Sequence, residues 1–283
     1  MLVTSRELLP VAQRNKYAVG AFNVENMEMV LAVLNAAEET RSPVIMQTTP
    51  GTLKYAGADF YFANIKAAAQ RASVPVVCHL DHGNSFGTAM LAFRAGYTSI
   101  MIDGSKLPFE ENIALTRSVV EVCSAANVPV EAELGRVGGK EDGLDNTKTD
   151  NPFTDPQEAA EFVERTKCDS LAVAVGTAHG VYKGTPHLNF EVLAKISELV
   201  DVPLVLHGTS GVPDDQVIRC VSMGMAKVNY ATDLRIAYTE GIKKYMVENP
   251  GVFDPKKYGA VGMEEVKKYV TGRMQVIGSC GKA

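Results

Sequence analysis

The sequence lacks the features that mark nucleic-acid-binding, secreted and membrane proteins. Its net charge is -5 and its pI is about 5.6, and its lysines and arginines are scattered, so no basic surface for nucleic acid is expected. No apolar run approaches the length that crosses a bilayer, and the first residues do not have the basic and apolar segments of a signal peptide. We therefore predict a cytoplasmic protein that binds neither nucleic acid nor membranes.

Cysteine is also sparse, and its spacing does not indicate a metal cluster or a disulfide framework. The five cysteines are far apart, no C-x-x-C occurs, and most of them lie in apolar runs. This pattern is typical of reduced core cysteines. The length of 283 residues, with 46% hydrophobic and 22% charged residues, allows a large core in one or two domains.

What the sequence does contain is a recurring unit, a short apolar run followed by an amphipathic helix. The predicted strands are residues 18–22, 44–47, 76–80, 99–102, 130–134, 170–175, 204–206 and 227–229. The helices between and after them are residues 27–39, 59–72, 87–95, 110–126, 156–166, 190–199, 214–223 and 234–247. Pro75, Pro129 and Pro203 each lie where the chain leaves a helix, and each fixes the turn into the strand that follows.

Eight such units predict an α/β fold, a (β/α)8 TIM barrel. Thr4 and Glu7 have the spacing of a capping box that opens a first helix, and one extra C-terminal helix is expected near residues 263–274. An open doubly wound sheet is disfavoured, because the first strand ends at Phe22-Asn23 without a G-x-G-x-x-G turn. We predict one domain over residues 1–283.

Polar residues follow the apolar runs at every predicted strand exit, which is the active face of this fold. They are Asn23, Gln47, Asp81, His82, Asp103, Glu131, Glu133, His179, His207 and the stretch from Asn229 to Thr232. Turn-favouring residues that simply end strands account poorly for the acids and histidines. Strand alternation places His79 and Asp81 on one face and Leu80 on the other, while His82 lies where strand gives way to loop.

Three of the five histidines, His82, His179 and His207, fall at the exits of strands three, six and seven. Three neutral imidazoles with one open position form a catalytic zinc arrangement. His79 lies upstream and is either a core residue or one that orients a ligand. We expect His187 on a surface loop.

A second constellation is suited to an anion. Glycines in Gly208-Thr209-Ser210-Gly211 allow backbone N–H groups to approach a phosphate, and hydroxyls there and in Asn229-Tyr230-Ala231-Thr232 add donors. Loops after strands seven and eight of a TIM barrel frequently bind phosphate. Lys183 either adds a positive charge or is a solvated lysine. Two long loops, residues 135–155 and 176–187, follow strands five and six at the active face.

At these residues the chain resembles the class II, zinc-dependent ketose-bisphosphate aldolases over its whole length. The resemblance rests on ordered motifs, namely Tyr17-Ala18-Val19-Gly20-Ala21-Phe22-Asn23, His79-Leu80-Asp81-His82-Gly83, Met101-Ile102-Asp103-Gly104-Ser105, Glu131-Ala132-Glu133-Leu134-Gly135, Gly138-Gly139-Lys140-Glu141-Asp142, Thr177-Ala178-His179-Gly180-Val181-Tyr182 and His207-Gly208-Thr209-Ser210-Gly211.

The resemblance implies that His82, His179 and His207 hold one Zn²⁺ and that Asp81 is the acid/base at the substrate C4 hydroxyl. It implies that Glu141 moves the C3 proton, and that Asp103 and Glu133 can touch a second or displaced metal. Dihydroxyacetone phosphate is expected around Gly180, Gly208, Ser210, Asn229 and Thr232, with Asn23, Lys183, Thr209, Tyr230 and Ala231 nearby. A monovalent cation, Na⁺ or K⁺, often assists there.

The implied reaction is reversible cleavage of a ketohexose 1,6-bisphosphate to dihydroxyacetone phosphate and glyceraldehyde 3-phosphate. Segments 49–52, 133–136 and 229–234 look more like the tagatose-bisphosphate branch, with fructose 1,6-bisphosphate as the alternative, although Tyr230 departs from the small aliphatic residue of either branch. The predicted sixth strand carries no lysine, which argues against an imine-forming aldolase.

Two other functions are weaker. A metal-dependent amidohydrolase would carry H-x-H where this chain has Phe22-Asn23, and a non-catalytic sugar-phosphate-binding subunit would have lost the proton donor or the ligands. Relatives form homodimers or homotetramers, and tagatose-branch enzymes can require a non-catalytic partner subunit. A basic residue of a neighbouring subunit can contact the far phosphate; Arg273 is either that residue or a solvated one.

Overall fold

The computed structural model describes residues 1–141, 144–146, 153–182, 184 and 186–283, without the side chains of 140–141 and 144–146. Eight parallel strands close into a barrel in the order β1-β11-β10-β8-β5-β4-β3-β2. They are β1 (Val19–Asn23), β2 (Val44–Thr48), β3 (Val76–Gly83), β4 (Ser99–Ile102), β5 (Val130–Leu134), β8 (Ser170–Val173), β10 (Leu204–Leu206) and β11 (Met225–Tyr230). The predicted (β/α)8 TIM barrel is confirmed.

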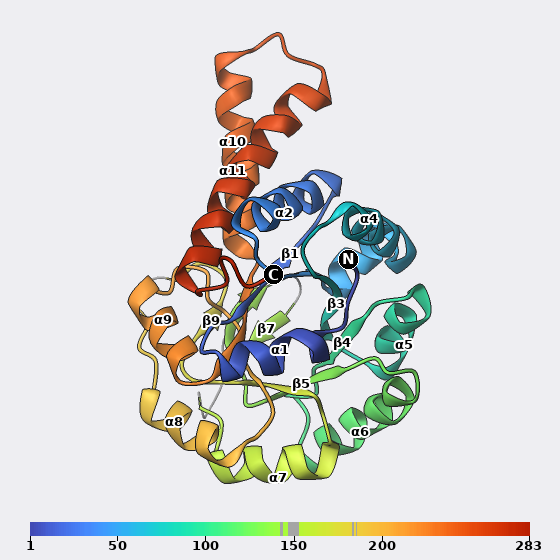
Figure 1. Cartoon of the computed structure of the whole chain (residues 1–283), viewed down its shortest axis with the longest axis vertical. Coiled ribbons are helices and arrows are strands. Elements are labelled where there is room, and N and C mark those ends of the chain that lie inside the picture. The colour runs from blue at the N-terminus through green and yellow to red at the C-terminus, as the bar shows by residue number, and fades with distance from the viewer. Residues whose placement is uncertain (142–143, 147–152, 183, 185) are drawn as a thin grey trace.

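Helices surround the barrel (Figure 1). They are α1 (Ser5–Arg14), α2 (Met27–Thr40), α3 (Pro50–Ala56), α4 (Ala58–Arg71), α5 (Phe86–Ala95), α6 (Phe109–Ala125), α7 (Pro156–Thr166), α8 (Phe190–Leu199), α9 (Asp214–Ser222), α10 (Thr232–Glu248) and α11 (Pro255–Val276). Several begin at a side-chain cap: Asn26 accepts from the Met29 amide, and Asp155 accepts from the first amides of α7. The predicted capping box of Thr4 and Glu7 is present at α1.

The three prolines predicted at strand entries are the points where the sheet begins. The carbonyl oxygens of Pro75, Pro129 and Pro203 accept hydrogen bonds from the amides of Val44, Ile100 and Leu171 on neighbouring strands. A proline cannot donate a ladder hydrogen bond, so it is tolerated at the first position of a strand, where only its carbonyl is needed.

The C-terminal helix was predicted near residues 263–274, and α11 is longer, from Pro255 to Val276. Asp254 caps it and Pro255 occupies its first turn, so its start is strongly specified. Gly259 and Gly262 lie inside this helix and are buried. A Cβ on Gly262 would lie 2.6 Å from the Tyr238 ring, so glycine here lets α11 pack closely on α10. Figure 1 shows the two helices as an arm that projects away from the barrel.

The two long loops at the active face carry a small second sheet. Its strands are β6 (Gly138–Glu141), β7 (Leu144–Asn146) and β9 (Ala178–His179), and β6 lies between the other two. Gly138 pairs with Ala178 and Gly139 with His179. Gly139 has φ +87°, and a Cβ there would lie 2.1 Å from the His179 carbonyl oxygen. The sheet therefore joins the strand-five loop directly to one of the predicted metal ligands.

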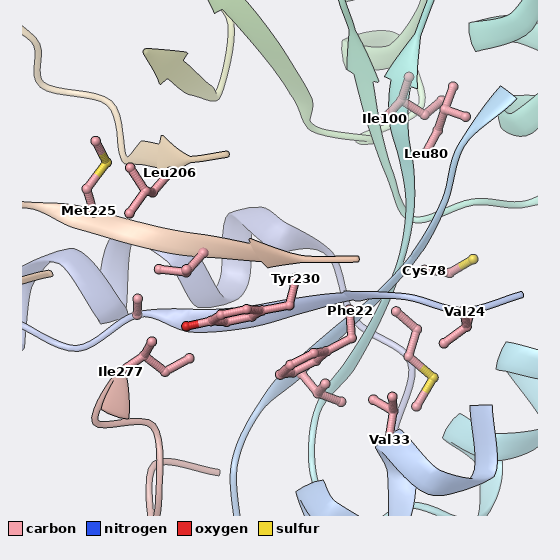
Figure 2. Close-up of a cluster of buried hydrophobic side chains, with 14 of the residues drawn as sticks. Phe22, Val24, Val33, Cys78, Leu80, Ile100, Leu206, Met225, Tyr230 and Ile277 are labelled. Atoms are coloured by element: carbon pink, nitrogen blue, oxygen red, sulfur yellow. The ribbon is translucent and has the colours of Figure 1, made fainter. Parts of the chain in front are cut away.

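The barrel wall separates an apolar outer layer from a partly polar interior. Outward-facing residues such as Phe22, Leu80, Ile100 and Leu206 form the main core with the helices (Figure 2). Burying each such side chain contributes about 1.5–3 kcal/mol. Inside the barrel, α1 closes the amino-terminal end over a small apolar layer, and the charged side chains lie beyond it toward the carboxyl ends of the strands. This arrangement collects the polar residues at one mouth.

Among the described residues, none of the helices combines the length and the apolar character that a membrane span requires.

Candidate active site

The centre of the site is the end of β3, where the backbone departs from regular strand geometry. His82 has φ +48°, a left-handed conformation that is uncommon outside glycine, and it lies within β3, which continues to Gly83. Regular alternation would place Asp81 and His82 on opposite faces of the sheet. The left-handed residue lets both side chains face the barrel interior. As predicted, His79 and Asp81 face inward and Leu80 lies in the outer core.

Two of the predicted metal ligands present lone pairs to each other. His82 Nδ1 lies 2.9 Å from Asp103 Oδ2, and His207 Nε2 lies 3.0 Å from Glu131 Oε1. A carboxylate only accepts, so each of these nitrogens carries the ring proton. The remaining nitrogens, His82 Nε2 and His207 Nδ1, are 3.0 Å apart. Two bare imidazole lone pairs at this distance repel, so the geometry requires a cation or a proton between them.

His179 on β9 completes the group. The ring centroid of His179 lies 5.0 Å from that of His82 and 6.0 Å from that of His207. One ligand atom from each of the three histidines falls within 4.8 Å of the others, and all three residues are buried. Two nitrogens that bind one zinc ion at about 2.0–2.1 Å with tetrahedral angles are about 3.3 Å apart, close to the observed His82–His207 separation. The donor set therefore fits zinc.

The electrostatics of the histidines agree with this geometry. Burial lowers the pKa of His82, but Asp81, the hydrogen bond to Asp103 and Glu133 outweigh burial and raise it to about 10. Burial lowers the pKa of His207 and holds that of His179 well below its usual value. One proton on His82 thus occupies the place between the facing nitrogens when no metal does, and the other two ligands stay neutral.

Asp103 and Glu133 lie on the far side of His82. Glu133 Oε2 is 3.7 Å from His82 Nδ1 and 3.6 Å from His207 Nδ1, too long for hydrogen bonds. Burial and the neighbouring Asp103 carboxylate raise the pKa of Glu133 well above its usual value. Ligand atoms of His82, Asp103 and Glu133 lie within 4.8 Å of one another, so this group forms a second position where a cation could be held.

Asp81 is held by two amides beside the histidines. Asn23 Nδ2 donates to Oδ2 at 2.8 Å, and Asn229 Nδ2 donates to Oδ1 at 3.1 Å. Gln47 fixes Asn23 in turn, since its Nε2 donates to Asn23 Oδ1 at 2.8 Å. Burial raises the pKa of Asp81, but His82, His207 and the other neighbours outweigh burial and bring it below the usual carboxyl range. Asp81 is therefore ionised and oriented at neutral pH.

A small pocket lies beside Asp81 and His179, and its roughly 250 Å³ of space free of protein atoms includes solvent at its opening. Its lining includes these predicted site residues: Asn23, Asp81, His179, Gly180, Gly208, Thr209, Ser210, Asn229, Ala231 and Thr232. Ala231 and Thr232 stand at the amino terminus of α10, where the positive end of the helix dipole favours an anion.

Gly208 shows why the loop after β10 needs glycine. It has φ +64°, and a Cβ there would lie 2.7 Å from the Ala178 backbone. Tyr182 holds the two segments together, because its hydroxyl accepts from the Ala178 amide at 2.6 Å and donates to the Gly208 carbonyl at 2.7 Å. Thr209 Oγ1 donates to the Asn229 carbonyl. The sequence did not predict this structural role of Tyr182, which was noted only as the last residue of the motif from Thr177 to Tyr182.

Four other predicted residues do not line the pocket with their side chains, or lie outside the part of the chain that the structure describes. The Tyr230 ring points into the outer core, stacked on Phe22 with centroids 5.5 Å apart, so only its backbone is near the pocket (Figure 2). Lys183 and the Glu141 side chain are outside the described residues. Arg273 makes an ion pair with Asp214 at 2.6 Å.

The remaining histidines are placed as follows. His79 Nδ1 is hydrogen-bonded to Ser99 Oγ at 2.7 Å, and the residue is buried. His187 is exposed, as expected of a surface loop.

Comparison with known proteins agrees with the fold and with the aldolase family that the motifs predict. The family model described as class II fructose-bisphosphate aldolase matches residues 3–282. The YdjI aldolase of Escherichia coli is 39% identical, with both chains fully covered and a TM-score of 0.89. A candidate fructose-1,6-bisphosphate aldolase of Coccidioides immitis is 34% identical over 98% of this chain and 96% of its own, with a TM-score of 0.90. The fructose-bisphosphate aldolase of Campylobacter jejuni is 25% identical over 100% and 97%, with a TM-score of 0.84.

The family model matches nearly the whole chain. At one end of the barrel the structure brings together three histidines, an oriented aspartate and a pocket lined by glycines and hydroxyls. The chain belongs to the class II fructose-bisphosphate aldolase family and is an aldolase, a carbon–carbon lyase.

Proposed function

We propose that this chain catalyses the zinc-dependent, reversible cleavage of a ketohexose 1,6-bisphosphate to dihydroxyacetone phosphate and glyceraldehyde 3-phosphate. The observation that carries the proposal is the pair of facing imidazole nitrogens, 3.0 Å apart, next to an ionised aspartate fixed by two amides. The facing nitrogens would hold a cation, and the aspartate beside them would exchange a proton with the substrate.

His82, His179 and His207 would hold the zinc ion. When bound, zinc supplies a Lewis acid for the substrate carbonyl and for the negative charge that develops beside it. Asp103 orients His82 and Glu131 orients His207. We propose the group of His82, Asp103 and Glu133 as a second or displaced metal position.

Asp81 acts as the acid/base. In the cleavage direction its carboxylate takes the proton from the C4 hydroxyl, the C3–C4 bond breaks, C4 leaves as an aldehyde and the bonding electrons remain on the C3 fragment. Glu141 is proposed to deliver the proton to C3. Asn23 and Asn229 each occupy one lone pair of the Asp81 oxygens and leave others for the substrate. A positioned carboxylate of this kind contributes about 10²–10⁴-fold to the rate.

The phosphate of dihydroxyacetone phosphate would lie in the pocket formed by Gly180, residues 208–210 and residues 229–232. The helix dipole at the start of α10 and the hydroxyls of Ser210 and Thr232 would stabilise its charge. Lys183 and a Na⁺ or K⁺ ion are proposed to assist. A monovalent cation would offset the charge of the phosphate next to Asp81.

Tagatose 1,6-bisphosphate is the favoured substrate and fructose 1,6-bisphosphate the alternative. The preference rests on segments 49–52, 133–136 and 229–234, which look more like the tagatose branch. The two sugars differ only in configuration at C4, the carbon whose hydroxyl Asp81 serves. Discrimination therefore depends on hydrogen bonds around that hydroxyl.

The test is the initial rate of triose phosphate release from each bisphosphate, with and without a chelator. We expect cleavage that the chelator abolishes and that added zinc restores, faster with tagatose 1,6-bisphosphate. Asp81→Ala should retain zinc and lose about 10²–10⁴-fold in kcat. Turnover near the wild-type rate in zinc-loaded Asp81→Ala would show that the mechanism is wrong.

We also propose a cytoplasmic homodimer or homotetramer, with a non-catalytic partner subunit as a further candidate. The five cysteines are free, and four of them are buried, as expected in a reducing compartment. The projecting arm of α10 and α11 leaves Val247 and Phe253 81% and 91% exposed, and self-association would cover them (Figure 1). Light scattering after size-exclusion chromatography measures the subunit number.

A further inference from the structure

A lysine lies inside the barrel, next to the histidines but outside the substrate pocket. Lys227 is fully buried on β11, and its Nζ lies 3.0 Å from Glu131 Oε2 and 3.2 Å from Oε1. It shares the inner face of the strand with Asn229, which binds Asp81. A buried ion pair is usually no more stabilising than apolar side chains of similar volume, so its presence calls for a role beyond stability.

Glu131 connects this lysine to a metal ligand. Its Oε1 accepts from His207 Nε2 at 3.0 Å, while Lys227 contacts both carboxylate oxygens. The lysine therefore fixes the carboxylate, and the carboxylate fixes the proton of His207 on Nε2. The ring is left with a lone pair on Nδ1, the atom that faces His82 Nε2. A histidine with the other tautomer would present an N–H to the metal position.

His82, the second predicted metal ligand with a carboxylate partner, is oriented in a different way from His207. It is held by Asp103, which itself accepts a hydrogen bond from the Ser105 backbone amide at 3.0 Å. Asp103 is thus positioned by its own loop. Glu131 lies deeper, on β5, with the Glu133 carboxylate two residues along on the same face and 3.6 Å from His207. Lys227 therefore donates hydrogen bonds to Glu131, as the Ser105 backbone amide does to Asp103.

We propose that Lys227 and Glu131 form a positioning pair that holds metal ligand His207 in the tautomer and orientation needed for zinc. This inference rests on the zinc site of the proposed function. Carboxylate partners of ligand histidines typically contribute 10–100-fold to metal affinity. The pair acts through His207 and does not contact substrate, so its effect should appear in metal binding itself.

The experiment measures zinc affinity by competition with a chromophoric chelator in the wild type, Glu131→Gln, Lys227→Met and the double variant. We expect affinity to fall about 10–100-fold in Glu131→Gln and about 10-fold in Lys227→Met. Because the two residues act as a unit, the loss in the double variant should be smaller than the product of the single losses. The visible spectrum of the Co²⁺ form should change in each variant, which reports ligand geometry independently of activity.

Ser99→Ala is the matched control. Ser99 is as deeply buried as Glu131 and Lys227 and is hydrogen-bonded to His79 and Ser5, but no hydrogen bond joins it to Glu131. It should lose thermal stability and keep wild-type zinc affinity and the wild-type Co²⁺ spectrum.

The outcomes separate this inference from the function on which it rests. Wild-type protein that binds no zinc would overturn the proposed function and the inference with it. Wild-type protein that binds zinc, with variants that bind it equally well and lose only stability, would overturn the inference alone. If either single variant fails to fold, the double variant decides, since it removes both buried charges together.

Discussion

The two halves of the proposed active site, the metal side and the phosphate side, are built by different means. On the metal side, side chains from β3 and β5 meet others that follow directly after β4 and β10. The contacts are charged or imidazole pairs such as His82–Asp103 and His207–Glu131. On the phosphate side the pocket is largely loop and backbone, held by left-handed glycines such as Gly208 and by the Tyr182 hydroxyl. The metal side depends on the chemistry of its side chains. The phosphate side depends on backbone conformations and close contacts that require glycine.

The comparison predicts that the halves fail in different ways. A substitution on the metal side should remove the ion and stop the reaction whatever the substrate concentration. A substitution on the phosphate side should displace donors by a fraction of an ångström, raise KM and leave the ion bound. Measurements of zinc content and of KM therefore distinguish the two halves.

The largest effect is expected for His179→Ala. Loss of one of three ligands should reduce zinc content to near background and kcat by at least about 10³-fold, because the ion supplies several kcal/mol of charge stabilisation. Metal analysis and initial rates measure both. His187→Ala is the matched control, an exposed histidine on the same segment, and it should leave both quantities unchanged. A zinc-free His179→Ala protein that turns over normally would show that the metal side is not catalytic.

Gly208→Ala tests the phosphate side and should have the next largest effect. The new Cβ would lie 2.7 Å from the Ala178 backbone, and φ +64° is strained for alanine by about 1–3 kcal/mol. We expect KM to rise about 10-fold or more with zinc affinity unchanged. Gly184→Ala is the control, since nothing among the described residues lies within 4 Å of its Cβ position. If Gly208→Ala lost zinc instead, the two halves would not be independent.

The third prediction concerns pH and the metal side alone. With a pKa of about 10 in the folded metal-free protein, His82 carries a proton at pH 7–9. Zinc must displace it, so apparent affinity should rise about tenfold per pH unit in this range. Calorimetry in buffers of different ionisation enthalpy should count one proton released per zinc. A count of zero would mean that His82 is neutral before zinc binds.

The same raised pKa affects the stability of the metal-free protein. Because the folded pKa lies above the ordinary value of 6.5, the stabilisation is fully present below pH 6.5 and is lost as the pH rises toward 10. The zinc-loaded protein should not show this loss, because the ion replaces the proton. Asp103→Asn should diminish the effect, since Asp103 is one of the groups that raise the pKa of His82.

Much of the barrel and of the metal side follows from sequence, because apolar runs, strand-entry prolines and polar exits report strand positions directly. The left-handed conformation of His82 does not follow, since histidine adopts it more often than most residues but still only occasionally. The burial of Lys227 was also not predicted, because a lysine at the start of a strand is usually exposed to solvent. Its burial depends on Glu131, which is 96 residues away in the chain. The extent of α11 was underestimated because Gly259 and Gly262 weaken a helical pattern unless the partner helix is known.

The smallest effect on activity is expected for a substitution of Tyr230, which lies between two residues of the phosphate side but does not contribute its own side chain. Its neighbours Asn229 and Ala231 line the pocket, but its own ring lies in the outer core between Phe22 and Tyr269, and its hydroxyl makes no hydrogen bond to any residue that the structure describes. Tyr230→Phe should therefore change KM less than twofold and the free energy of unfolding by less than about 1 kcal/mol, in either direction, since a buried hydroxyl without a partner brings no net gain. Asn229→Ala, one residue earlier and on the opposite face, should lower kcat by removing a donor to Asp81. A Tyr230→Phe variant that weakened substrate binding as strongly as Gly208→Ala would show that the hydroxyl takes part in the phosphate side.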